Sequence, residues 1–270
     1  MIIPVSCVVT KTHLKEFMLL KFSLEQYHEC KWYIASDTAS HNILKDFPNI
    51  VSQEFPITDG KVDIDGPEST ENFFNTIMYK FVVARTALKA HGHVLSVDTD
   101  IIFTNRMDIH YGHFLNNTDL DVAVSPHYQW NPMMDNDWGR YNVGFQLLKS
   151  ERFLDAWENL TRQRIYKFEQ VPMAKLLEDN TFNFAEFPIN YNMGWWRFNN
   201  AQSVHRVNSF YFRQKRLMFD GLPVVCFHFH TFVKDVHSPQ FRNAVIPNLA
   251  KSEGYHALLT KIQEIEQSTL

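Results

Sequence analysis

The sequence has few cysteines, and their arrangement argues against a disulfide framework. Cys7, Cys30 and Cys226 are odd in number and widely spaced, and each lies in an apolar, strand-like context. Such residues are typical of buried thiols in a reducing compartment. We therefore expect a cytoplasmic protein.

Long apolar runs and clustered basic charge are also missing. No run approaches the roughly 18 apolar residues of a membrane span, and the first residues lack the basic start and small-residue cleavage site of a signal peptide. A net charge of −4 without a basic cluster argues against a nucleic-acid partner. No repeat, linker or low-complexity segment interrupts the 270 residues. One domain over residues 1–270 is the simplest division.

The first part of the chain has the pattern of a parallel sheet. Residues 4–10 and 31–36 are apolar, β-branched runs that predict strands, and residues 13–27 between them have a helical period. Strand, helix and strand within this length form the minimal parallel unit. Thr10 and Asp37 would follow adjacent strands at one edge. They are interpreted either as nucleotide contacts or as a cap and a turn residue. Residues 38–70 are predicted to be a polar connection.

A helix predicted over residues 71–91 leads into the stretch on which the interpretation depends. Ser69 or Thr70 is expected to cap this helix and Gly92 to end it. Lys80 lies off the apolar stripe, where a lysine on a surface helix is ordinarily solvated. The helix is followed by residues 93–103, HVLSVDTDIIF.

This stretch places Asp98 and Asp100 between two apolar runs, at the predicted end of a buried strand. The carboxyl ends of such strands are where open α/β sheets bind ligands. Two carboxylates with no cation nearby in sequence would repel each other unless they share a metal such as Mg²⁺ or Mn²⁺. A solvated strand end is the alternative. Only this pair combines an apolar approach, an apolar exit and a preceding helix; the other D-x-D pairs are Asp63/Asp65, Asp119/Asp121 and Asp135/Asp137.

The rest of the chain adds further strands, helices and one long loop. Strands are predicted over residues 120–125, 142–148 and 223–232, and helices over 153–160, 169–177 and 252–270. The last strand alternates, so His228 and His230 should share one face. The polar and aromatic loop at residues 126–140 is long for a connection and is predicted to be a substrate lid.

In order and spacing, these motifs resemble the GT-A nucleotide-sugar glycosyltransferases. The first match is the helix that carries Lys80, followed by the strand and Asp98-Thr99-Asp100. The second is Asn142-Val143-Gly144-Phe145, which is similar to an N-x-G-F segment that lines the sugar site opposite the metal. The third, from His228-Phe229 to Lys234, resembles the H-F-x-G-x-x-K segment of the glycogenin-like group, with Thr231 in place of the glycine. The resemblance spans residues 2–235.

The resemblance implies an α/β fold of the GT-A, Rossmann-like type, with a mixed, mostly parallel central sheet flanked by helices. It divides the chain into a nucleotide-binding half (1–104), an acceptor half (105–250) and a C-terminal helix (251–270). The small size and the missing membrane anchor are also similar to soluble glycosyltransferases of large algal viruses. The expected activity is hexosyl or pentosyl transfer from a nucleotide sugar to a saccharide hydroxyl.

The expected site residues fall into three groups. A metal would be held by Asp98 and Asp100 with His228, His230 or both, and an imidazole ligand favours Mn²⁺ over Mg²⁺. The donor, expected to be UDP-linked xylose, glucose or galactose, would meet Thr10, Asp37, Lys80, Asp98, Thr99, Asp100, Asn142, Gly144 and Lys234. The candidate bases are Asp135, Asp137 and Glu169, each of which could instead be a solvated carboxylate or a helix cap.

Two other functions are compatible with the same residues. A metal-dependent nucleotide-sugar phosphohydrolase would use water as the acceptor. A non-catalytic sugar-binding module would keep the aromatic residues and use no metal.

Overall fold

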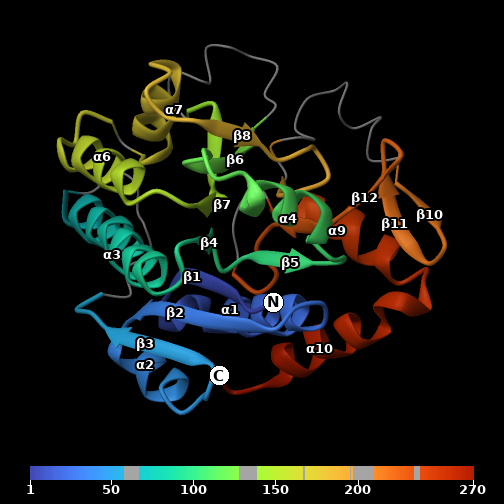
Figure 1. Ribbon diagram of the computed structural model, residues 1–270. Coiled ribbons are helices and arrows are strands. Elements are labelled where there is room, and N and C mark those ends of the chain that lie inside the picture. The colour runs from blue at the N-terminus through green and yellow to red at the C-terminus, as the bar shows by residue number, and fades with distance from the viewer. Residues whose placement is uncertain (58–66, 128–138, 167, 195, 197–209, 234–237) are drawn as a thin grey trace.

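The computed structural model describes residues 1–57, 67–127, 139–166, 168–194, 196, 210–233 and 238–270. Its centre is a seven-stranded sheet in the order β3-β2-β1-β4-β7-β6-β8 (Figure 1). All neighbouring pairs are parallel except those of β7, which is antiparallel to both β4 and β6. The strands are β1 (Ile3–Val9), β2 (Cys30–Ser36), β3 (Ile50–Glu54), β4 (Val94–Val97), β6 (Val122–Pro126), β7 (Tyr141–Leu148) and β8 (Phe184–Glu186).

Helices cover both faces of this sheet because its strands are apolar on both sides. In β2, Trp32 and Ile34 belong to one buried cluster with α1, while Tyr33 and Ala35 belong to another with α3. On the α3 side lie α3 (Pro67–His91), α6 (Glu151–Arg162) and α7 (Gln170–Glu178). On the opposite side lie α1 (Leu14–Glu25), α2 (Thr38–Leu44) and α4 (Asp108–Asn116). The predicted mixed, mostly parallel sheet flanked by helices is confirmed.

Two small sheets complete the described fold. One joins β5 (Ile101–Phe103), β13 (Cys226–His228) and β9 (Met193–Gly194), and the other joins β10 (Tyr211–Arg213), β11 (Arg216–Phe219) and β12 (Leu222–Pro223). They share a third apolar cluster with α9 (Ser238–Leu249) and α10 (His256–Gln267). Short 3-10 turns, Lys11–His13 and Glu253–Tyr255, precede α1 and α10. The predicted C-terminal helix is therefore present, and α10 packs against α1.

Three predicted segments differ from the structure. Residues 38–70 are not simply a connection, because they contain α2 and β3. These elements are short, and the edge strand β3 is mostly half-buried, so neither has a strong period. Helix α3 begins at Pro67, so Ser69 and Thr70 lie within it instead of capping it. Gly92 does end it, with φ at +73°.

The third difference concerns the strand predicted over residues 223–232. In the structure β13 extends only from Cys226 to His228. Phe229 N–H still donates to the carbonyl of Asp100, which continues the pairing with β5 by one residue. The strand does not extend further because the N–H groups of Thr231 and Phe232 donate to a side chain of α1. The candidate histidines therefore lie on a strand end and a turn.

Cys7, Cys30 and Cys226 are buried and form no disulfide, as predicted. Across the described ranges, no helix has both the length and the hydropathy that crossing a membrane requires.

Candidate metal centre

Asp98 and Asp100 lie where the chain leaves the large sheet. Asp98 follows the last residue of β4, and Asp100 precedes β5, which belongs to the small sheet with β13. In that small sheet His228 is the register partner of Ile101. The antiparallel pairing of β5 with β13 therefore brings a histidine from late in the chain next to Asp100.

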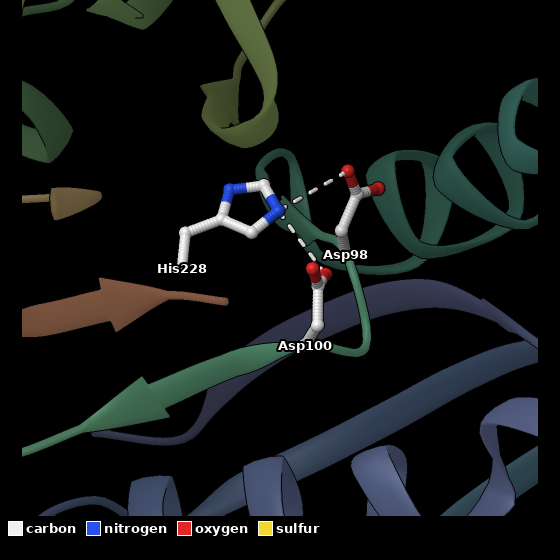
Figure 2. Close-up of side chains that lie close together, drawn as sticks. All are labelled: Asp98, Asp100 and His228. Atoms are coloured by element: carbon white, nitrogen blue, oxygen red, sulfur yellow. Dashed lines mark ion pairs between the residues drawn. The ribbon is translucent and has the colours of Figure 1, made fainter. Parts of the chain in front are cut away.

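Figure 2 shows the imidazole of His228 with one ring nitrogen facing both carboxylates. Its Nε2 lies 3.1 Å from Oδ1 of Asp100 and 3.9 Å from Oδ2 of Asp98. One ligand atom from each residue lies within 4.8 Å of the other two. The structure thus brings together three of the four residues predicted as metal ligands in a group of the size that one ion can occupy.

The fourth candidate, His230, faces the other carboxylate oxygen of Asp100. Its Nδ1 is 3.5 Å from Oδ2 of Asp100. Burial alone would raise the pKa of Asp100, but His228 and His230 hold it well below its usual range. Burial would likewise lower the pKa of His228, but Asp100 raises it above its usual value. The three-residue group of ligand atoms contains His228 and not His230, which favours His228 as the ligand.

A chain of hydrogen bonds fixes which nitrogen of His228 faces the aspartates. The backbone N–H of Gly144 donates to Oδ1 of Asn142 at 2.9 Å, which sets the orientation of that amide. Asn192 Nδ2 donates to the same oxygen at 2.9 Å, so Asn192 presents its own Oδ1 to Nδ1 of His228, also at 2.9 Å. Nδ1 must therefore carry a proton. Nε2 is then the nitrogen that can give its lone pair to a metal.

Gly144 leaves the space in which these ligands meet. A Cβ at this position would lie 2.3 Å from Cε1 of His228 and 2.7 Å from Oδ2 of Asp98. Its carbonyl also accepts the backbone N–H of Asp98 at 2.9 Å. The N-x-G-F segment is expected opposite the metal, but the pairing of β7 with β4 places it against the candidate metal ligands instead. Two carboxylate oxygens and one oriented imidazole nitrogen, in a space that a Cβ would fill, fit a divalent ion such as Mn²⁺.

Lys80 is buried beside this group instead of being solvated. Its Nζ donates to Oδ1 of Asp98 at 2.8 Å and to Oε1 of Glu169 at 3.3 Å. Burial alone would lower the pKa of Lys80, but the two carboxylates raise it above its usual range. The lysine therefore remains charged and fixes Asp98 on the side away from His228. Glu169, a predicted base, is buried at the start of α7 with its carboxylate engaged by this ammonium.

The remaining candidates have mixed positions. Both oxygens of Asp37 accept backbone N–H groups, from Lys11 at 2.6 Å and Ser40 at 2.7 Å, so Asp37 caps α2 and ties it to the end of β1. Thr10 Oγ1 hydrogen-bonds to His13 Nδ1 at 2.9 Å. Thr99 is buried in the turn between the two aspartates. Three further candidates, Asp135, Asp137 and Lys234, lie outside the described residues.

The described ends of the predicted lid lie at this site. His127 N–H donates to the carbonyl of Arg140 at 2.9 Å, and His127 Nδ1 donates to the carbonyl of Gly139 at 2.8 Å. On its other side, His127 Nε2 accepts from Nδ2 of Asn142 at 3.3 Å. The loop therefore leaves and re-enters the fold next to the amide network that orients His228; its residues 128–138 lie outside the described part of the chain.

Several residues of this network are not predictable from the sequence pattern. Asn192 is fully buried and has φ at +50°, a left-handed conformation that asparagine adopts more readily than most residues. Trp196 packs edge-on against the ring of His228, with centroids 4.9 Å apart. Both come from an aromatic, asparagine-rich stretch without a period. Its unusual composition was the only available signal.

Comparisons with known proteins support the fold. No family model and no curated protein matches the sequence. Among solved structures, mouse xyloside xylosyltransferase 1 in its apo form matches with a TM-score of 0.55 at 13% identity, over 88% of this chain and 99% of that chain. The galactosyltransferase LgtC, bound to donor and acceptor sugar analogues, gives 0.57 at 10% identity, over 95% and 100%.

A third solved structure, a glycosyltransferase involved in glycosylation of the major capsid of PBCV-1, gives a TM-score of 0.51 at 9% identity, over 90% of this chain and 98% of that chain. These structural similarities extend over nearly the whole length of both compared chains. The chain has the GT-A fold, as its motifs predicted.

Proposed function

We propose that this chain is a metal-dependent glycosyltransferase that moves a sugar from a nucleoside-diphosphate donor to a saccharide hydroxyl. The observation that carries the proposal is the group Asp98, Asp100 and His228 at the carboxyl edge of a GT-A sheet. That edge is where open α/β sheets bind nucleotides. The buried charge of Lys80 beside Asp98 adds support.

The chemistry of the reaction explains why such a group is needed. Cleavage of the bond between sugar and diphosphate develops negative charge on the leaving phosphate oxygen, which must be stabilised before the bond breaks. A bound Mn²⁺ or Mg²⁺ would act as a Lewis acid and supply the positive charge that balances it. Asp98, Asp100 and His228 would hold the ion, and Lys80 would keep the carboxylate of Asp98 oriented. Lys234 is proposed to contact the diphosphate.

The acceptor side is proposed to come from residues 105–250, and the nucleotide side from residues 1–104. Glu169 is already paired with Lys80, so Asp135 and Asp137 are the better candidates for a group that receives the acceptor proton. The donor is proposed to be UDP-linked, with UDP-xylose, UDP-glucose and UDP-galactose as the first to test. Mn²⁺ is the proposed metal because imidazole is among the ligands.

The test is nucleotide release from a panel of UDP- and GDP-sugars by chelator-treated protein, with and without Mn²⁺ and with and without saccharide acceptors. The proposal predicts release that requires Mn²⁺ and rises with one class of acceptor. Metal-dependent consumption that no acceptor accelerates would indicate a phosphohydrolase. Saccharide binding without metal and without turnover would indicate a binding module.

A further inference from the structure

Glu16 is the most deeply buried carboxylate of the described residues, with 1% of its surface exposed. It lies on α1, among residues that pack apolar side chains against the sheets. A single oxygen, Oε1, accepts three successive backbone N–H groups: from Thr231 at 2.8 Å, Phe232 at 2.7 Å and Val233 at 3.1 Å. Successive N–H groups that converge in this way form an anion-binding concavity. Here the protein's own side chain fills it.

The segment that turns around Glu16 directly follows the candidate metal ligands. His228 ends β13, and Phe229 N–H donates to the carbonyl of Asp100 at 3.0 Å. His230 then lies between two carboxylates, with Nδ1 3.5 Å from Oδ2 of Asp100 and 4.0 Å from Oε1 of Glu16. The path of residues 229–233, after the candidate metal ligand His228, is therefore set at two points: the carbonyl of Asp100 and the carboxylate of Glu16.

Burying a carboxylate costs free energy because it loses its hydration. The contacts that Glu16 makes in the interior therefore indicate its role. Burial raises the pKa of Glu16 to about 7, although the N–H groups of Phe232 and Val233 act in the opposite direction. An apolar side chain would leave three backbone donors without this acceptor, one buried and two partly buried, which is also costly. Because Glu16 is covered by protein, it can hold this turn but cannot itself touch a substrate.

We propose that Glu16 is a positioning residue: its carboxylate fixes the turn at residues 231–233, and so sets where His230 and this turn meet the donor diphosphate. This inference rests on the proposed function. It assigns to a residue of α1 a share of donor affinity that no motif in the sequence indicates.

The test compares Glu16→Leu, which removes the acceptor, with Glu16→Gln, which keeps an acceptor oxygen. Glu25→Gln is the matched control, because Glu25 ends the same helix and accepts from Trp32 Nε1 and Asn49 Nδ2 instead. Amide hydrogen exchange at residues 231–233 measures the anchoring, and calorimetric titration with UDP in saturating Mn²⁺ measures its consequence.

We expect Glu16→Leu to speed exchange of these amides at least about 10-fold, because their opening would no longer break a hydrogen bond. UDP affinity should fall about 10-fold through loss of preorganisation. Glu16→Gln should restore both quantities to within about threefold, because the three donors regain an acceptor. Glu25→Gln should leave both unchanged. If Glu16→Leu does not fold, Glu16→Asp replaces it, since its carboxylate is withdrawn by one methylene and the same losses are expected.

Several results would overturn the inference. One is a folded Glu16→Leu or Glu16→Asp with wild-type exchange at residues 231–233. Another is faster exchange with unchanged UDP affinity, which would mean that Glu16 serves stability alone. A third is a Glu16→Gln variant as impaired as Glu16→Leu. If the wild type binds neither UDP nor GDP with Mn²⁺, the proposed function fails, and the exchange measurement still decides whether Glu16 anchors the turn.

Discussion

Replacing Gly144 with alanine tests the metal centre with a single added methyl group. The new Cβ would lie 2.3 Å from Cε1 of His228 and 2.7 Å from Oδ2 of Asp98, whereas ordinary contacts begin at 3.4 Å. The imidazole and the carboxylate would each have to move away from the new Cβ, the imidazole by about 1 Å. A displacement of that size can reduce the rate of reaction in a preorganised site about 10²-fold. We expect Mn²⁺ affinity to fall about 10- to 100-fold and stability to fall by about 1–3 kcal/mol from overpacking.

Mn²⁺ titration followed by electron paramagnetic resonance measures the affinity, and thermal unfolding without metal measures the stability. Gly112→Ala is the matched control, because a Cβ at Gly112 of α4 meets nothing within 4 Å. That variant should bind Mn²⁺ like the wild type. Wild-type Mn²⁺ affinity in a folded Gly144→Ala protein would refute the placement of the metal between His228 and Asp98.

Three further predictions concern the residues around the metal centre and the loop. Asn192→Gly keeps the left-handed backbone but removes the acceptor of the imidazole N–H, so Mn²⁺ affinity in a titration should fall about 10-fold or more. Asn192→Asp keeps an acceptor and should retain most of the affinity. Equal losses in the two variants would contradict the assignment of the proton to Nδ1 of His228. Lys80→Met should lower the free energy of unfolding, measured in urea, by about 3 kcal/mol because it leaves Glu169 buried without a partner. Adding Glu169→Gln should recover part of that loss. If the two substitutions instead lowered the free energy of unfolding additively, the pairing of Lys80 with Glu169 would be contradicted. Asp135→Asn combined with Asp137→Asn should reduce transfer to a saccharide at least about 10²-fold while UDP and Mn²⁺ still bind; parallel loss of binding and transfer would make the loop a scaffold.

The central part of the fold could be predicted because its elements are local and strongly patterned. β1, α1 and β2 follow each other closely, and their apolar runs match the two faces of the sheet. The stretch with Asp98 and Asp100 could be selected over similar pairs because only it lies between two apolar runs. Both runs proved to be strands, although in different sheets.

The partners of these aspartates could be predicted only in part, because they depend on contacts between distant segments. His228 reaches Asp100 through the pairing of β13 with β5, and Asn192 reaches His228 through a side-chain hydrogen bond. The burial of Lys80 had no local signal either, since its helical position is typical of a solvated lysine. Its partner Glu169 directly precedes α7, on the same face of the sheet. Pairings of this kind become visible only when the sheets are assembled.

The most direct test of the metal site is pulsed electron paramagnetic resonance on the protein with bound Mn²⁺ and UDP. We predict nitrogen coupling from one imidazole, lost in His228→Ala and retained in His230→Ala, together with phosphorus coupling from the diphosphate. Nitrogen coupling that survives His228→Ala, or a Mn²⁺ signal without phosphorus coupling at saturating UDP, would contradict this prediction.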